Sequence, residues 1–428
     1  MRKLLVVSCA ALGSEAARRA DFGRFGRLLE VEPAFPAVTT TAQATLLTGL
    51  RPAEHGAVGN GFFDRELRRA FFWEQSAGLV SGQRLWERIE HRHGEACRTA
   101  LLFFQNSIGT NADAVVTPAP LHGPDGGVIS ACYTRPPILS AELEAELGSF
   151  PLHQYWGPMA GAESSHWIIE CTRTVMEAHS PDLLCTYLPH LDYDLQRFGP
   201  AGAEADAALA ALSHMVEELA VAAERHGYHL VISGDYAIEP AEGFALPNLA
   251  LREEGLLHIR RVGDCELPDM GSSLLFAVVD HQIAHVYCQA DYCPQAAVDA
   301  LDGLAGVGRI LDRDAQKEMG VAHPRAGDLI LEAAPGHWFA YDWWADESCA
   351  PPYARAVDIH NKPGYDPLEL FAGADRKGTE RDGNRLGGTH GRAGGGTAAL
   401  IVPEKSDMPE RLLQSTEVCG CLCQLAGG

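Results

Sequence analysis

The sequence predicts an α/β protein with a largely parallel central sheet flanked by helices. Apolar runs at residues 3–9, 100–104, 183–188 and 229–233 are typical of buried strands. Segments between them carry apolar residues at helical spacing, as in 203–225. Strands that alternate with helices form parallel sheets covered on both faces, and catalytic groups gather beyond the carboxyl ends of such strands.

The composition indicates a soluble enzyme and excludes two classes of partner. A chain of 428 residues is long enough for one elaborated domain or two. A net charge of −23 argues against nucleic acid and anionic membranes, because both are bound by basic surfaces. No apolar run after the first strand approaches the roughly 20 residues of a membrane helix. We expect a small molecule as the partner and leave the oligomeric state open.

The N-terminus allows two interpretations. Met1-Arg2-Lys3 followed by LLVVSCAALG has the outline of a short secretory signal, but its apolar run is barely long enough, and we favour a first core strand. The 12 cysteines are irregularly spread and show no zinc-ribbon spacing. This predicts reduced thiols in a cytoplasmic protein. A thiolate metal cluster at Cys419, Cys421 and Cys423 is the alternative.

The segment 33–60, PAFPAVTTTAQATLLTGLRPAEHGAVGN, contains a threonine run before a Thr48-Gly49 stop. It looks like a phosphoryl-transfer nucleophile loop, in which a hydroxyl needs a base or a cation beside it to react at neutral pH. The plain alternative is a helix start, with Thr39 or Thr40 as N-cap and residues 42–47 helical. Both interpretations can hold together, because helix N-termini attract anions.

This segment resembles the nucleophile region of the type I phosphodiesterase, or nucleotide pyrophosphatase/phosphodiesterase, branch of the alkaline phosphatase superfamily. With Thr48-Gly49 as anchor, the resemblance implies that Thr39 is the nucleophile and that Asn60 helps to hold a phosphate oxygen. It also implies an alkaline phosphatase-like core at 1–240 with 381–428. The interval 241–380, richer in Pro, Trp and short strand-like runs, then corresponds to a smaller inserted cap.

Three later motifs match the family in chain order. Asp192 follows a strand and stands before Phe198-Gly199-Pro200, Asp235 follows the next strand, and His390 lies in a Gly-x-His-Gly motif. The resemblance implies that these three residues are metal ligands near Thr39.

Three other ligand positions of the family are substituted. Ala10 replaces an aspartate, while Gln196 and Tyr236 each replace a histidine. Two protein ligands per ion are few for zinc, which usually has three at catalytic sites. Either metal binding is weak, or other residues complete the shell. The candidates are Asp358, His360, His281 and His190, each of which is otherwise a surface or capping residue.

The resemblance implies a metal-dependent hydrolase of phosphodiesters or nucleotide pyrophosphates that forms a covalent phospho-threonine. Its cofactor would be a divalent metal, with zinc as the first choice and one or two ions, and its partner a small phosphorylated substrate. Two alternatives stay open, namely an inactive member that binds a phosphorylated ligand and a phosphonate hydrolase. A sulfatase is disfavoured, because a threonine cannot be converted to formylglycine.

An aromatic group follows the nucleophile segment. Phe62, Phe63, Phe71, Phe72 and Trp73 lie close together in the sequence. A diesterase of this superfamily offers an apolar pocket to the second ester group. These side chains either form such a pocket or belong to the core.

Overall fold

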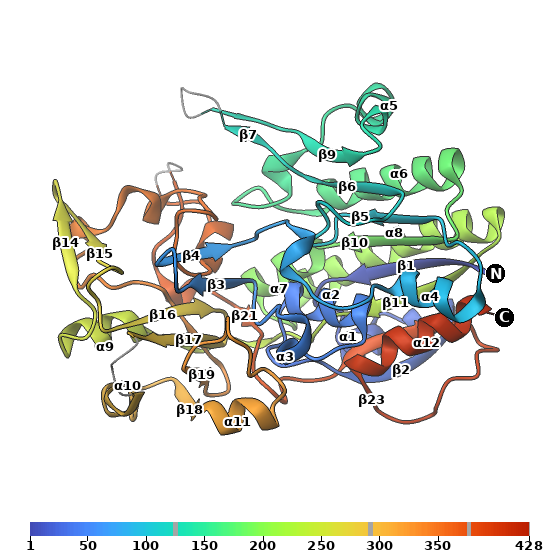
Figure 1. Cartoon of the computed structure of the whole chain (residues 1–428). Helices are drawn as coiled ribbons and strands as arrows, with labels where there is room; N and C mark the ends of the chain where they lie inside the picture. The colour runs from blue at the N-terminus through green and yellow to red at the C-terminus, as the bar shows by residue number, and fades with distance from the viewer. Residues whose placement is uncertain (123–126, 290–293, 375–377, 428) are drawn as a thin grey trace.

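The computed structural model describes residues 1–122, 127–289, 294–374 and 378–427. It confirms the predicted α/β class. The largest sheet among the described residues has nine strands in the order β23-β2-β22-β11-β1-β10-β5-β6-β9 (Figure 1). Their bounds are β1 (Lys3–Cys9), β2 (Arg27–Glu32), β5 (Thr99–Leu102), β6 (Ala114–Pro118), β9 (Cys132–Arg135), β10 (Leu183–Leu188), β11 (Tyr228–Gly234), β22 (Ala398–Val402) and β23 (Leu413–Gln414).

Strand β1 lies at the centre of a parallel group. It pairs in parallel with β10 and β11, and β10 continues in parallel to β5 and β6. In this register Cys9 is opposite both Leu188 and Gly234. The residues that follow these three strands therefore leave the sheet at one edge, which brings Ala10, the start of α7 and Asp235 together.

Two groups of helices cover the sheet (Figure 1). One face carries α6 (Ala162–His179), α7 (His190–Phe198) and α8 (Ala203–His226), and the other carries α2 (Thr39–Thr48), α4 (Leu85–His93) and α12 (Ser415–Gly427). Strand β1 is apolar over most of its length because both of its faces are covered. The remaining helices are α1 (Ser14–Arg19), α3 (Pro52–His55), α5 (Ile138–Leu147), α9 (Pro247–Glu253), α10 (Pro294–Leu301) and α11 (Arg313–Glu318).

A second, antiparallel sheet lies in the interval expected to form the cap. Its order is β16 (Leu275–Asp280), β17 (Ile283–Cys288), β19 (Leu329–Ala333) and β18 (Val307–Leu311). The sheet has its own hydrophobic core, to which Phe63 and Phe72 of the hairpin β3 (Gly61–Asp64) and β4 (Arg69–Phe72) also belong. Residues 61–72, assigned to the catalytic core in the sequence, thus pack on the cap. The domain boundaries themselves stay a prediction.

Shorter strand pairs lie outside these two sheets. They are β7 (Leu121–His122) with β8 (Val128–Ile129), β12 (Glu239–Pro240) with β21 (Gly388–Thr389), β13 (Gly243–Ala245) with β20 (His337–Phe339), and β14 (Ile259–Val262) with β15 (Cys265–Pro268). None of the helices in the described part of the chain is long and apolar enough to span a membrane.

Candidate active site

The threonine run forms the first turn of α2. This helix begins at Thr39 and ends at Thr48, where Gly49 adopts the left-handed conformation with φ of 68°. The N-cap is Val38, without a side-chain hydrogen bond, so neither Thr39 nor Thr40 caps the helix as the plain alternative expected. The Thr39 hydroxyl instead lies 3.1 Å from the hydroxyl of Tyr236.

Asn60 holds this helix start from outside. Its Oδ1 accepts the Thr40 backbone N–H at 3.0 Å, and its Nδ2 donates to Asp280 Oδ1 at 3.1 Å. The Thr40 N–H is therefore engaged and is not free to bind a phosphate oxygen. Asn60 lines a small neighbouring cavity with Thr40. An amide nitrogen carries two hydrogens, so one is left for a ligand.

Asp192 is the centre of the site. It lies in the first turn of α7, and its Oδ2 accepts a hydrogen bond from Gln196 Nε2 one turn later, at 2.6 Å. Its Oδ1 accepts the hydroxyl of Tyr236 at 3.3 Å. Burial raises the pKa of Asp192 to about 7, while these two hydrogen bonds act in the opposite direction. Gln196 in turn accepts the hydroxyl of Tyr365 at 2.8 Å.

His390 stacks on the ring of Tyr236, with ring centroids 3.7 Å apart and planes 9° from parallel. Its Nδ1 lies 2.8 Å from the Ala37 carbonyl and donates to it, which leaves Nε2 with the lone pair. Nε2 lies 3.6 Å from Asp192 Oδ1 and has no hydrogen-bond partner. Burial lowers the pKa of His390 well below its ordinary value, so the ring is neutral.

Asp235 lies behind this group. Its Oδ1 accepts the backbone N–H groups of Ala11 at 2.7 Å and of Tyr236 at 2.9 Å, and its Oδ2 is buried without a partner. Burial raises the pKa of Asp235 well above its usual range. Ala10, which precedes Ala11 at the end of β1, is fully buried. Its side chain has no atom that could bind a metal ion where the family has an aspartate.

The additional ligand candidates lie in different places. His281 packs between Tyr365 and His390, at centroid distances of 3.6 and 3.9 Å, and its Nδ1 is 2.8 Å from Asp280 Oδ1. It adopts a left-handed backbone with φ of 58°, a conformation that non-glycine residues keep only where the surroundings enforce it. His360 lines the pocket but is exposed.

The other two ligand candidates, Asp358 and His190, form hydrogen bonds with residues outside this site. The carboxylate of Asp358 accepts hydrogen bonds from the backbone and side chain of Asn361. His190 is bound through Nδ1 to the hydroxyl of Ser165 at 3.0 Å. No described contact brings either residue to Asp192.

The described side chains at this site do not form the metal centre that the resemblance implies. Within residues 1–122, 127–289, 294–374 and 378–427, no group of three or more His, Cys, Asp or Glu side chains is arranged to hold a metal ion. Both oxygens of Asp192 accept hydrogen bonds from the side chains that replace two ligand histidines. A two-metal centre therefore does not fit this arrangement of side chains.

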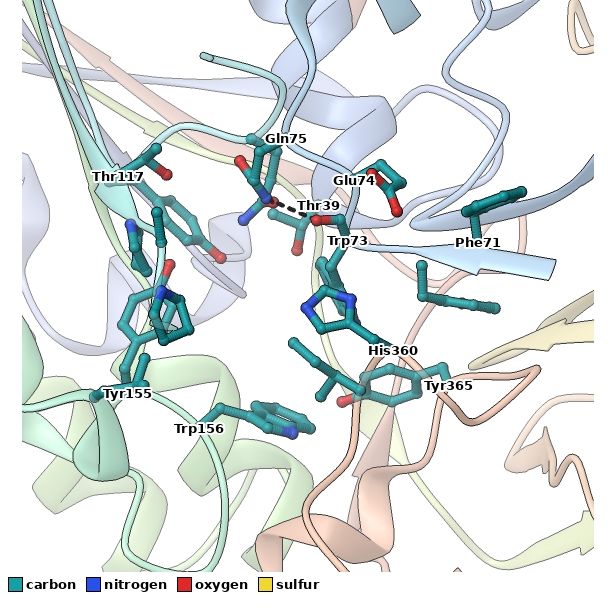
Figure 2. Close-up of a pocket in the computed structure, with 18 of the residues that line it drawn as sticks. Thr39, Phe71, Trp73, Glu74, Gln75, Thr117, Tyr155, Trp156, His360 and Tyr365 are labelled. Carbon is teal, nitrogen blue, oxygen red and sulfur yellow. Dashed lines mark hydrogen bonds between the residues drawn. The ribbon is translucent and has the colours of Figure 1, made fainter. Parts of the chain in front are cut away.

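A cavity of about 540 Å³ opens beside Thr39. Figure 2 shows Thr39 in the upper part of the pocket, with Phe71 to the right, Tyr155 to the lower left, and Trp156 and Tyr365 below. The lining also includes Asp192, Tyr236, His281 and Phe72. Its aromatic character suits a flat or apolar organic group.

The aromatic group predicted from the sequence is divided. Phe71, Phe72 and Trp73 line the pocket, whereas Phe63 packs in the core of the cap. Phe62 stacks on Phe71, with centroids 5.8 Å apart, and lines the small cavity of Asn60.

Sequence reasoning missed two aromatic residues that line the pocket. Neither Tyr365 nor Trp156 belongs to a recognisable motif. The only signal at Tyr365 is its place in the turn-like sequence Gly-Tyr-Asp-Pro. Nothing in the sequence connects Asp280, the neighbour of His281, to Asn60.

The fold is a mixed α/β architecture with a large, mostly parallel central sheet, and the candidate site lies beyond the carboxyl ends of its strands. Residues 23–366 match the family model described as type I phosphodiesterase / nucleotide pyrophosphatase. The chain belongs to this family.

Solved structures share the fold at low sequence identity. Phosphonoacetate hydrolase from Sinorhizobium meliloti 1021 in complex with phosphonoformate is 14% identical with a TM-score of 0.65, covering 100% of this chain and 96% of its own. Murine ectonucleotide pyrophosphatase / phosphodiesterase 5 is 14% identical with a TM-score of 0.62, covering 99% and 95%. An inactive threonine-to-alanine variant of the murine protein in complex with AMP has the same identity and TM-score, covering 100% and 95%.

Proposed function

We propose that the protein hydrolyses a phosphate ester of the diester or nucleotide pyrophosphate type, with Thr39 as nucleophile. The observation that carries this proposal is the position of Thr39. It is the first residue of α2, and it lines the aromatic pocket (Figure 2). A helix N-terminus favours a bound anion through its free N–H groups and its dipole. The inactivity of the murine threonine-to-alanine variant supports a threonine in this role.

The reaction has two displacements. Thr39 Oγ1 forms a bond to phosphorus while the bond from phosphorus to the leaving oxygen breaks, and the departing alcohol or phosphate takes up the proton that the Thr39 hydroxyl loses. Water then attacks the phospho-threonine, breaks the bond from phosphorus to Oγ1 and returns a proton to Thr39. The remaining amide hydrogen of Asn60 is placed to stabilise charge on a non-bridging oxygen.

The charge of the pocket favours a diester over a monoester. Among its lining residues that the structure describes, Arg69 is the only arginine or lysine, and it is exposed. A terminal dianionic phosphate needs a strong cationic clamp, whereas a diester carries one negative charge and a second organic group. Trp73 and Trp156 offer that group an apolar surface.

Two other candidates have specific support. The hydrogen bonds that engage Asp192 favour a member that binds a phosphorylated ligand without turnover. The fold shared with phosphonoacetate hydrolase keeps a phosphonate substrate open. Divalent metal dependence, expected from the resemblance, has no place in the proposed steps because the donor set does not fit it. A cytoplasmic location stays a prediction from the cysteine pattern.

A substrate panel tests the proposal. Bis(4-nitrophenyl) phosphate, a nucleoside 5′-(4-nitrophenyl) phosphate, 4-nitrophenyl phosphate and phosphonoacetate are compared with wild type and Thr39→Ala. We expect turnover of the diesters, little of the monoester, and none by the variant. Binding of AMP by calorimetry without turnover of any substrate supports the inactive binder. Turnover of phosphonoacetate alone supports the phosphonate hydrolase.

A further inference from the structure

We propose that this site has exchanged the metal ions of its family for a hydrogen-bonded network in which Tyr236 directs the hydroxyl of Thr39. The role given to Thr39 rests on the proposed function, whereas the absence of a resident ion rests on the geometry around Asp192.

The side chains at the substituted positions are hydrogen-bond donors, whereas the histidines of the family offer lone pairs to a metal ion. A histidine ligand offers a ring-nitrogen lone pair to an ion. Here Gln196 offers an N–H and Tyr236 an O–H, and both donate to Asp192, at 2.6 and 3.3 Å. The one acceptor atom of the Gln196 side chain takes the hydroxyl of Tyr365. Hydrogen bonds thus satisfy Asp192 where a cation would otherwise do so.

Counting hydrogens at Tyr236 fixes the direction of the contact with Thr39. A phenol carries one hydrogen, and that of Tyr236 goes to Asp192. In the 3.1 Å contact between the two hydroxyls, Thr39 is therefore the donor and Tyr236 the acceptor. The hydrogen of Thr39 is directed to Tyr236, which leaves its lone pairs for a phosphorus atom in the pocket. Tyr236 is a positioning residue in this arrangement.

A stack of rings holds Tyr236 in place. It packs on His390, His390 on His281 and His281 on Tyr365, with centroid distances of 3.7, 3.9 and 3.6 Å. The hydroxyl of Tyr365 returns to Gln196, which closes the network. All five side chains are buried. Opening a space for an ion beside Asp192 would require Tyr236 to leave both this stack and its hydrogen bonds.

The second ion position of the family is lost in a different way. Ala10 supplies no ligand, and Asp235 directs Oδ1 to two backbone N–H groups. Asp235 borders a small cavity of about 30 Å³ that is also lined by Ser8 and Gln43, and it does not line the pocket of Thr39. A cavity of this size holds about one water molecule.

Metal analysis tests the loss of the ion without reference to activity. Protein purified without chelator is dialysed against zinc and then against metal-free buffer, and zinc per chain is measured by mass spectrometry. We expect wild type to keep well below one ion per chain. The variant Gln196→His with Tyr236→His should take up about one ion. Adding Asp192→Asn to that double variant is the matched control and should remove the gain.

The role of Tyr236 is tested by Tyr236→Phe, which keeps the ring and the stack but removes the hydroxyl. We expect kcat for the best diester to fall at least about 10-fold while KM changes little, because the hydroxyl orients Thr39 and binds no substrate. An unchanged melting temperature separates this effect from a structural one. Unchanged kcat overturns the role of Tyr236.

The outcomes separate this proposal from the proposed function. Stoichiometric zinc in wild type that is lost in Asp192→Asn overturns the metal-free site, as does turnover that EDTA abolishes and zinc restores. If no substrate of the panel is turned over, the proposed function fails, and the zinc content of wild type and of the histidine variant still decides whether the ion has been replaced.

Discussion

Asp280 accepts two hydrogen bonds from Asn60, one from its backbone N–H at 2.7 Å and one from its amide at 3.1 Å. Asp280 ends strand β16 of the cap, whereas Asn60 holds the first turn of α2 through Thr40. The cap therefore positions the helix of the candidate nucleophile, although the two residues are 220 positions apart in the chain.

The first prediction concerns this connection. Asp280→Asn keeps the shape but replaces a charged acceptor by an amide, one side of which is a donor. Because buried hydrogen bonds to charged groups are worth about 1.5–3 kcal/mol each, we expect a loss of stability and a fall in kcat/KM of roughly 10-fold or more. Urea unfolding and diester kinetics measure the two effects. A double-mutant cycle with Asn60→Ala in urea unfolding isolates the contact between the two residues, and losses that simply add would contradict a role through Asn60.

The second prediction assigns the nucleophile between neighbours. Thr39 contacts Tyr236 and lines the aromatic pocket, whereas Thr40 lines the small cavity of Asn60. Thr39→Ala should lower kcat by at least about 1000-fold without unfolding the protein, and Thr39→Ser should keep part of the activity. Thr40→Ala should stay within roughly 10-fold of wild type. An inactive Thr40→Ala beside an active Thr39→Ala would move the role by one residue.

Much of the fold follows from the sequence because buried parallel strands must be apolar throughout. Lys3–Cys9 and Leu183–Leu188 have the predicted bounds, and α8 ends one residue beyond the predicted helix. The common strand edge also explains why Asp192 and His390 meet, since topology collects distant loops there.

The rest of the site depends on side-chain geometry that no local pattern contains. Gln196 and Tyr236 could be recognised as substitutions, but not as partners of one carboxylate, because that requires their final rotamers. The hydrogen bond from Tyr365 to Gln196 joins residues 169 positions apart, and it depends on how the cap packs against the core. Thr39 was expected as a possible N-cap, yet its hydroxyl is directed to a tertiary contact instead of the helix backbone.

The third prediction concerns substrate selection. Trp156 lines the pocket, lies near Tyr365 with centroids 5.8 Å apart, and donates its Nε1–H to Glu369. Trp156→Ala removes a large aromatic surface, so KM for aryl diesters should rise roughly 10-fold. The inhibition constant of dimethyl phosphate, which has no aromatic group, should be high and equal in wild type and Trp156→Ala, because the tryptophan contacts only the organic group. An equal loss of affinity for both ligands would indicate a general disturbance of the site.

The fourth prediction concerns the buried ammonium group of Lys362, which pairs with Glu369, the hydrogen-bond partner of Trp156. Lys362 is 2% exposed and lies 2.9 Å from Asp366 and 2.6 Å from Glu369. Lys362→Met leaves buried Glu369 without its cation and leaves Asp366 with Arg381 alone, 3.4 Å away, and we expect a loss of about 3–5 kcal/mol in the free energy of unfolding. Lys362→Arg keeps the charge and should lose less. The measurement is urea unfolding at pH 7, and a loss below that of the arginine variant would contradict the assignment.

The last prediction is a pH dependence set by His55 beneath α2. His55 is fully buried, its Nδ1 accepts the Ala57 N–H at 3.1 Å, and its Nε2 lies 3.0 Å from the Thr45 hydroxyl. Burial, with smaller contributions from Arg84 and His323, lowers the pKa of His55 to about 3. The folded protein thus keeps this ring neutral.

An unfolded histidine takes up a proton near pH 6.5, so the contribution of neutral His55 is complete above that pH and is lost as the pH falls toward 3. The slope for this one group is up to about 1.4 kcal/mol per pH unit. His55→Asn removes buried ring atoms and one of the two ring contacts, so it is less stable than wild type at pH 7, and its side chain cannot be protonated. Its deficit should shrink by about 2 kcal/mol at pH 5. Urea unfolding of both proteins at the two pH values gives this difference, and a deficit that stays constant would show that His55 is not held neutral by the fold.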